Sequence, residues 1–151
     1  MAADGRVTIA FLASGIEGIK VRLTARGHDD EHARSLLHDE ETLVRQVIEE
    51  KLGDIIFGVD EETMEDAIAT RLVARGLSLG LAESLTGGLI ASRLVNVPGA
   101  SKWFRGSIVS YATEVKFDLL GVAEGPVVSA AAAEAMAIGA RRVLGLSLIH
   151  I

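Results

Sequence analysis

The sequence predicts an α/β protein in two parts: a small α+β domain over residues 1–59, then part of a three-layer α/β/α domain over residues 60–145. Two observations favour this class. Short apolar runs with strand-like alternation are interleaved with segments whose apolar residues recur every three or four positions. From Asp60 onward the order is helix, strand, helix, strand, helix, which is typical of a sheet whose strands are joined by crossover helices.

The first domain is expected to begin with a hairpin. Residues 7–13 and 19–25 read as its two strands, joined by the loop 14–18, because apolar and polar residues alternate along the second strand. The apolar run 55–59 is predicted as a third strand.

A long helix is expected between the hairpin and that third strand. Apolar residues repeat there at helical spacing, with Asp29 or Asp30 as the first cap and Gly53 as the end. Asp39 and Glu40 offer a point at which the segment divides into two helices.

The second domain is expected to contain only two strands, and such a sheet leaves most of its helical faces uncovered. We therefore predict that this domain is incomplete. Its expected elements are a helix ending at Gly76, a strand 77–81, a helix 87–94, a strand 104–112, a helix 115–120 and a helix 129–144.

Composition excludes several function classes. A formal net charge of −6 argues against a general nucleic-acid binder, which needs a basic face. The chain has no cysteine, and so no disulfide and no thiolate. No apolar run approaches the roughly 20 residues that span a bilayer, and no signal peptide is evident. A soluble cytoplasmic protein without a membrane partner is the expectation.

The segment Ala82-Glu83-Ser84-Leu85-Thr86-Gly87-Gly88 lies between a predicted strand and a predicted helix. Ser84 is the candidate nucleophile, because a hydroxyl at such a turn can lie beside exposed backbone donors. The N–H groups around Thr86, Gly87 and Gly88 are candidates to bind an oxyanion or a phosphate. The alternative is an ordinary turn in which Ser84 or Thr86 caps the next helix.

Lys116 and Tyr111 are the candidate partners of this serine. An uncharged lysine amine can remove the proton of a hydroxyl, and a phenol can donate a hydrogen bond. The alternative for Lys116 is a solvated residue paired with Glu114 or Asp118, and for Tyr111 a cover for the end of its strand. Glu83 points to the opposite strand face, so we expect it to orient backbone or bind a neighbouring helix rather than act as base.

The run 28–32 matches the H-x-x-E-H pattern of inverted zinc peptidases. Its spacing puts His28 and His32 on one helical face, so a zinc peptidase is a further alternative. The run lies at a predicted helix start, where acidic residues are favoured by the helix dipole, and no third ligand is nearby. No metal site is therefore expected.

Residues 77–145 resemble the first part of the C-terminal domain of the CinA family, which also occurs alone as nicotinamide-nucleotide amidase. Residues 7–59 resemble the small KH-like connector that precedes this domain, whereas residues 146–151 do not resemble the family pattern. The matching blocks are Ala82-Glu83-Ser84-Leu85-Thr86-Gly87-Gly88, Val97-Pro98-Gly99-Ala100-Ser101, Ile108-Val109-Ser110-Tyr111-Ala112 with Val115-Lys116, Leu119-Leu120-Gly121-Val122, and Val127-Val128-Ser129 with Met136-Ala137-Ile138-Gly139-Ala140-Arg141.

The resemblance implies hydrolysis of the carboxamide of nicotinamide mononucleotide to nicotinic acid mononucleotide and ammonia, a step of pyridine-nucleotide salvage. It makes Ser84 the nucleophile, Lys116 its base and Tyr111 a member of their hydrogen-bond network. The implied oxyanion or substrate contacts are Thr86, Gly87 and Gly88.

The implied partner is a small nucleotide substrate, and no cofactor is required. Uncovered apolar faces of an incomplete sheet are compatible with a homo-oligomer. The alternative function is a non-catalytic nucleotide-binding module, or an interaction module associated with competence or DNA damage, which an incomplete site favours.

Overall fold

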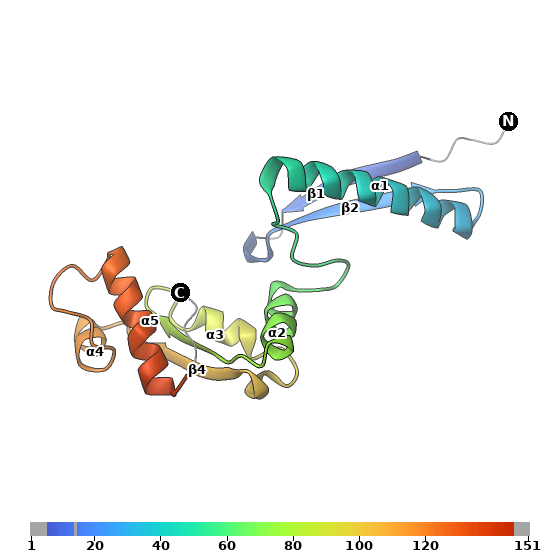
Figure 1. The fold of residues 1–151 in the computed structure, drawn as a ribbon. Helices are drawn as coiled ribbons and strands as arrows, with labels where there is room; N and C mark the ends of the chain where they lie inside the picture. Colours follow the sequence, from blue (N-terminus) through green and yellow to red (C-terminus); the bar gives the residue numbers. More distant parts are fainter. Residues whose placement is uncertain (1–5, 14, 147–151) are drawn as a thin grey trace. The chain divides into compact units, whose positions relative to one another are not determined.

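The computed structural model describes residues 6–13 and 15–146. Its chain divides into two compact units, Met1–Thr63 and Met64–Ile151, a few residues beyond the boundary expected at Asp60 (Figure 1). Helices and small sheets occur in both units, so the predicted α/β class is confirmed. No helix in the described part of the chain is long and apolar enough to cross a membrane.

The first unit is a hairpin covered by one long helix. The strands pair antiparallel, with Phe11 opposite Val21. Its elements are β1 (Arg6–Ala13), the short 3₁₀ helix η1 (Gly15–Glu17), β2 (Ile19–Arg26) and α1 (Asp30–Leu52).

Helix α1 begins with a side-chain cap. Asp29 accepts the backbone N–H of His32 at 2.8 Å, which satisfies one of the free donors of the first turn. The helix continues through Asp39 and Glu40, so the alternative of two helices is wrong. The third strand expected at 55–59 is also wrong, because the only sheet among the described residues of this unit pairs β1 with β2 and leaves that run without a strand partner.

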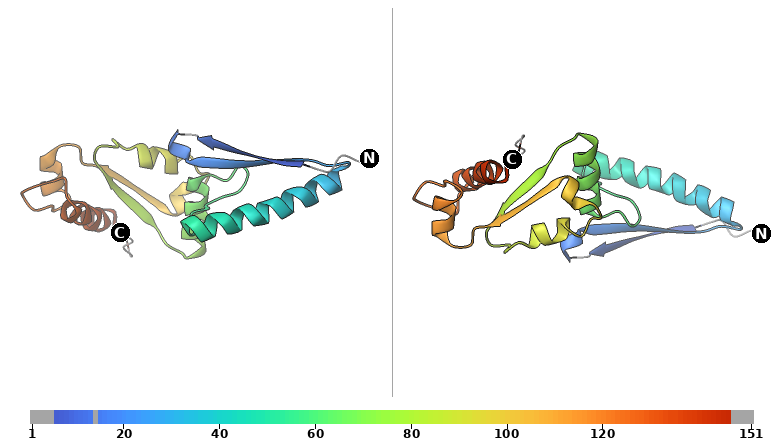
Figure 2. Two further views of the ribbon diagram at one scale, coloured as in Figure 1. Left: turned by 90° about the horizontal axis from the view of Figure 1, so that it is seen from above. Right: turned by 90° about the horizontal axis from the view of Figure 1, so that it is seen from below.

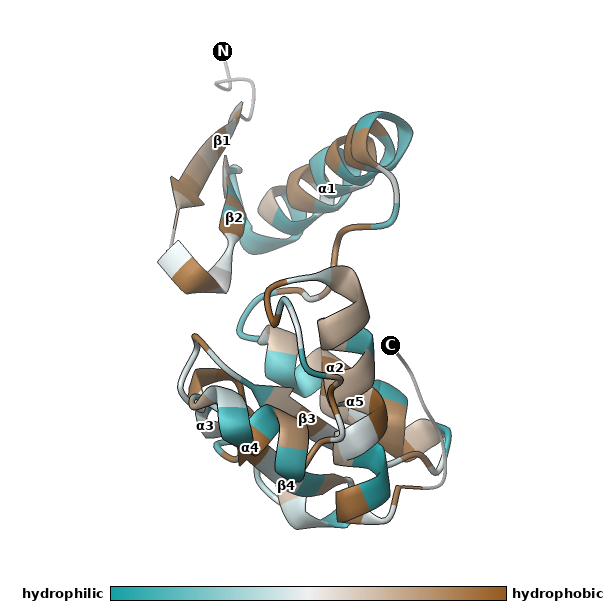
Figure 3. Cartoon of the chain, turned by 90° about the vertical axis from the view of Figure 1, so that its left-hand side faces the viewer, coloured by the Kyte–Doolittle hydropathy of each residue, from teal (hydrophilic) through white to brown (hydrophobic). Residues whose placement is uncertain are grey.

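The hairpin presents one mainly apolar face. The register puts Ile9 and Phe11 of β1 opposite Leu23 and Val21 of β2. Figure 3 colours β1 largely brown, for hydrophobic, whereas β2 is mixed. Phe11 is nevertheless 74% exposed, and no residue of α1 is fully buried. The helix therefore covers this face only in part.

The second unit contains a two-stranded parallel sheet between layers of helix. Figure 2 shows α5 on one side of the strands, with α2 and α3 on the other. Glu83 lies opposite Val109 and Leu81 opposite Ser107. The elements are α2 (Met64–Ala74), β3 (Leu79–Glu83), α3 (Leu89–Leu94), η2 (Ala100–Lys102), β4 (Phe104–Val109), α4 (Thr113–Asp118) and α5 (Ala130–Leu144).

Two apolar clusters hold these layers together, and the alternation of β3 divides its side chains between them. Ala82 packs against the α5 cluster, whereas Leu79 and Leu81 pack against the opposite one. The α5 cluster contains Leu120, Val122, Ala132, Met136 and Ala140, and the opposite cluster contains Ala69, Leu94, Ala100 and Trp103. Because β3 extends to Glu83, two residues beyond its predicted end, the alternation also fixes the side chains at the start of the next turn.

Candidate functional site

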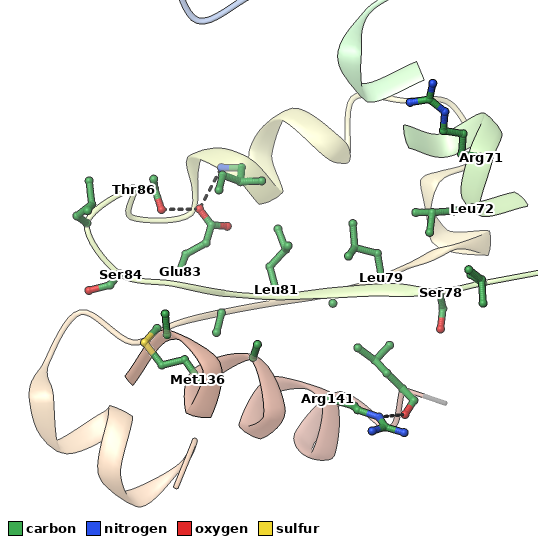
Figure 4. A pocket seen from close by; sticks show the side chains of 18 of the residues that line it. Arg71, Leu72, Ser78, Leu79, Leu81, Glu83, Ser84, Thr86, Met136 and Arg141 are labelled. Atoms are coloured by element: carbon green, nitrogen blue, oxygen red, sulfur yellow. Dashed lines mark hydrogen bonds between the residues drawn. The ribbon is translucent and has the colours of Figure 1, made fainter. Parts of the chain in front are cut away.

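The turn after β3 presents Ser84 on the side of the sheet opposite Glu83 (Figure 4). Ser84 is half-buried, and its hydroxyl makes no hydrogen bond to any residue that the structure describes. The N-cap of α3 is Gly88, which makes no side-chain cap bond. The alternative of Ser84 or Thr86 as the helix cap is therefore wrong, and the Ser84 hydroxyl is available to another partner.

Glu83 occupies the other side of the strand as a buried carboxylate, only 3% exposed. Its Oε2 accepts the hydroxyl of Thr86 at 2.9 Å and the N–H of Ile90 at 3.0 Å. Its Oε1 accepts the N–H of Ala91 and the hydroxyl of Ser107, each at 3.0 Å. Glu83 thus binds backbone and a neighbouring helix, as its place in the sequence predicted.

The protonation of Glu83 follows from these bonds. Burial acts to raise the pKa of the carboxyl group, but the hydrogen bonds from Ala91, Ile90, Thr86 and Ser107 favour the ionised form. Together they hold the pKa of Glu83 below its ordinary value. At neutral pH the group is a carboxylate that accepts hydrogen bonds and has no proton to give.

Lys116 lies inside the protein, only 4% exposed. Its Nζ donates to the carbonyl oxygen of Ser110 at 2.5 Å and to that of Tyr111 at 3.3 Å. No ion pair joins it to Glu114 or Asp118 within the described chain. The alternative of a solvated surface lysine is therefore wrong.

A short chain of hydrogen bonds links Lys116 to the turn that carries Ser84. Ser110 donates its backbone N–H to the carbonyl oxygen of Glu83 at 2.8 Å, and its hydroxyl lies 3.4 Å from the same oxygen. The carbonyl oxygen of Ser110 in turn accepts the lysine amine. The residue immediately before Ser84 is thus two hydrogen bonds away from the Lys116 amine.

Tyr111 contributes its backbone to this arrangement. Its side chain is 76% exposed, and its hydroxyl makes no hydrogen bond within the described chain. Its carbonyl oxygen accepts the amine of Lys116. The role expected for the Tyr111 hydroxyl stays a prediction.

Some backbone N–H groups of the turn already donate a hydrogen bond within the protein, and others do not. The N–H of Gly87 donates to the carbonyl oxygen of Ser84 at 3.0 Å, so it is already occupied. The N–H groups of Thr86 and Gly88 donate to no acceptor among the described residues. The N–H groups of Ile90 and Ala91 donate to Glu83, which leaves no room there for a phosphate. The N–H groups of Thr86 and Gly88 are therefore available to a ligand oxygen.

A pocket of about 560 Å³ follows β3 and reaches this turn. Figure 4 shows Arg71 and Leu72 at one end of it, Ser84 at the other, and Met136 of α5 below the strand. Lys116 and Tyr111 do not line it. The pocket leaves space for a small molecule beside Ser84.

The histidine pair is not part of this site. The rings of His28 and His32 lie 4.2 Å apart between centroids, at the start of α1. Nowhere in the described chain do three or more metal-binding side chains gather as a metal site requires. The zinc-peptidase alternative therefore gains no support.

Two further residues of the site, Ser110 and Ser107, are not marked as site residues by any pattern in the sequence. Ser110 is fully buried and connects β3 to Lys116, and Ser107 donates to Glu83 from the neighbouring strand. Their type carries no signal, because serine is common in strands and turns. Only the parallel register, which places Ser107 opposite Leu81, brings it to the face of Glu83.

Comparisons with known proteins agree on one family. The family model described as CinA C-terminal domain matches residues 61–148. A CinA-like protein from Frankia casuarinae is 47% identical over 150 residues, and one from Geobacter sulfurreducens is 43% identical over 135 residues. These alignments cover 96% and 86% of the chain. The chain spans about a third of the length of these curated relatives, 34% and 32%.

Solved structures give the same likeness. A competence/damage inducible protein from Agrobacterium tumefaciens is 35% identical, with a TM-score of 0.51 over 53% of this chain and 52% of its own. A competence-damaged protein (CinA) superfamily member from Escherichia coli is 31% identical, with a TM-score of 0.54 over 62% of this chain and 59% of its own.

Proposed function

We propose, from the premise that this chain belongs to the CinA C-terminal domain family, that it carries an amidase site for nicotinamide mononucleotide. The products are nicotinic acid mononucleotide and ammonia. The observation that carries the proposal is the buried Lys116 amine, held two hydrogen bonds from the residue that precedes Ser84. The chain spans about a third of the length of these curated relatives, so the activity of the whole protein is also a proposal.

In this mechanism Ser84 Oγ attacks the carboxamide carbon while the uncharged Lys116 amine takes the hydroxyl proton. An uncharged amine has two hydrogens and one lone pair. In this proposal the two hydrogens bond the carbonyl oxygens of Ser110 and Tyr111, and the lone pair accepts the serine proton.

The tetrahedral intermediate carries its negative charge on the former carbonyl oxygen. The N–H groups of Thr86 and Gly88 are the donors proposed to stabilise it. Collapse of the intermediate breaks the carbon–nitrogen bond, and the Lys116 ammonium returns its proton to the leaving ammonia. Water then attacks the Ser84 ester with the amine again as base, which releases the carboxylate and restores the hydroxyl.

The test is ammonia release from nicotinamide mononucleotide, with nicotinic acid mononucleotide measured in parallel. We expect turnover by this chain or, where the site needs further residues, by the full-length Frankia casuarinae relative. Ser84→Ala should abolish the release. Ser92→Ala, which changes an exposed serine of the next helix, is the matched control and should leave the rate unchanged.

Absence of ammonia release by both proteins contradicts the proposal. Saturable binding of the nucleotide without turnover in both then favours the alternative, a non-catalytic nucleotide-binding module.

A further inference from the structure

We infer that Glu83 is a positioning residue, whose carboxylate fixes the turn 84–88 and thereby the placement of Ser84 and of the free N–H groups. The proposed mechanism gives Glu83 no proton to move, although it is one of the most buried charged groups of the chain. The inference rests on the proposed function only for its activity readout.

The bonds of Glu83 join three parts of the second unit. The Thr86 hydroxyl connects it to the turn, the N–H groups of Ile90 and Ala91 connect it to the first turn of α3, and the Ser107 hydroxyl connects it to β4. The turn is therefore tied to the sheet and to the helix through a single side chain.

The arrangement of these bonds requires a carboxylate rather than any group of similar shape. Each oxygen accepts one backbone N–H, from Ile90 or from Ala91, and one hydroxyl, from Thr86 or from Ser107. A glutamine in either orientation turns its NH₂ group toward one of the two backbone N–H groups. A hydroxyl can rotate to accept instead, but a backbone N–H cannot, so one donor–donor contact always remains.

Loss of the carboxylate should disturb the turn more than the rest of the unit. Thr86 then has no anchor, and the backbone that carries Ser84 and the Gly88 N–H can shift. A misplacement of about 1 Å at a reacting group lowers the rate by on the order of 10²-fold. We therefore expect a fall in kcat rather than a change in substrate affinity.

The test compares Glu83→Gln with Glu65→Gln in the 151-residue chain. Glu65 is a matched control, since it is also a buried carboxylate and contacts α3 through the side chain of Arg93. In Glu83→Gln we expect the amides of Ile90 and Ala91 to exchange with solvent at least about tenfold faster, with changed NMR resonances over residues 84–88. Glu65→Gln should leave those resonances in place.

The activity readout separates positioning from general stability. Measured per folded molecule, kcat should fall about 10²-fold in Glu83→Gln with KM within a few-fold of its original value. It should stay unchanged in Glu65→Gln. An equal fall in both variants, or unchanged resonances of residues 84–88 in Glu83→Gln, overturns the inference. If the unmodified proteins release no ammonia, the proposed function fails and the exchange measurement alone decides about Glu83.

A second pair of variants covers the case in which Glu83→Gln does not fold. Thr86→Val removes only the bond from the turn to the carboxylate, whereas Thr86→Ser keeps that hydroxyl. We expect altered resonances at 84–88 in Thr86→Val and near-original ones in Thr86→Ser. The same behaviour in both variants overturns the inference.

Discussion

At the scale of single residues, the proposed chemistry depends on one buried amine. The stem of Lys116 is packed inside the unit, and its Nζ reaches two carbonyl oxygens at the end of β4. No acidic side chain is paired with it in the described chain, so its hydrogen bonds are to neutral groups.

Lys116→Met should therefore remove the base while keeping most of the apolar stem. We expect kcat/KM for amide hydrolysis to fall about 10²- to 10⁴-fold, the usual contribution of a general base. Two carbonyl oxygens also lose a donor, so the assay is run well below the melting temperature of the variant. Lys102→Met, which changes an exposed lysine, is the control. Retention of more than about a tenth of the activity would contradict the role of base, given that contribution.

A second prediction concerns how the contribution of Glu83 to stability depends on pH. Because its pKa is lower in the folded protein than in the unfolded chain, its contribution to stability is present above the ordinary carboxyl pKa. That contribution is lost as the pH falls through the lowered value. Urea titrations at neutral pH should show Glu83→Gln less stable by about 2–3 kcal/mol, the cost of one unsatisfied buried donor. The difference should shrink as the pH falls through the acid range, and an equal difference at every pH would argue against a buried carboxylate.

The residues of this site whose chemical type is informative could be predicted from the sequence. A lysine and a serine at these positions suggest a base and a nucleophile, and Glu83 could be placed on the opposite face from strand alternation alone. Ser110 could not be found, because its contribution is a buried carbonyl and N–H, groups that every residue has. The exposure of the Tyr111 side chain could not be predicted from the sequence either, because it depends on where β4 ends.

At the scale of elements, α5 lies directly against the backbone of the segment after α4 at Gly139. A Cβ atom added at Gly139 would lie 2.1 Å from the carbonyl oxygen of Leu120 and 2.6 Å from its Cα. Both are backbone atoms, so they cannot move aside as the end of a side chain can. The absence of a side chain at this position lets the helix approach the backbone.

Gly139→Ala is therefore expected to destabilise the protein. In an open helix the same change stabilises by about 1 kcal/mol through helix propensity. Here the overlap forces α5 away from Leu120, and we expect a net loss of about 2–3 kcal/mol in the free energy of unfolding. Ile138→Ala, at a half-exposed neighbouring position, should cost less. A stabilised Gly139→Ala variant would show that α5 does not lie this close.

The elements also show where sequence patterns were sufficient. Helix α5 was expected from Ser129 to Leu144, and the structure has Ala130–Leu144 with Ser129 as the N-cap. Its cap residue and apolar repeat are local signals. The run 55–59 has an equally apolar composition but forms no strand, because a strand needs a neighbour and composition does not say whether one is free.

At the scale of the whole molecule, the chain divides into two compact units, and each long helix packs within its own unit. Helix α1 contacts β1 and β2, and α5 contacts β3 and β4. Each of the two helices begins with a side-chain cap of the same kind. Asp29 accepts the N–H of His32 at 2.8 Å, and Ser129 accepts the N–H of Ala132 at 3.1 Å. Removing one cap at a time therefore tests the stability of one unit at a time.

Asp29→Ala and Ser129→Ala should each weaken one unit. We expect faster amide exchange across α1 and the hairpin in the first variant and across α5 and the parallel sheet in the second, since each helix packs within its own unit. Loss of the Ser129 cap should cost about 1 kcal/mol. The cap bond holds the pKa of Asp29 low, so the effect of Asp29→Ala should fade as acid protonates the carboxyl group. Faster exchange across both units in either variant would instead show that the chain unfolds as one cooperative body, because a local change then spreads through all its helices.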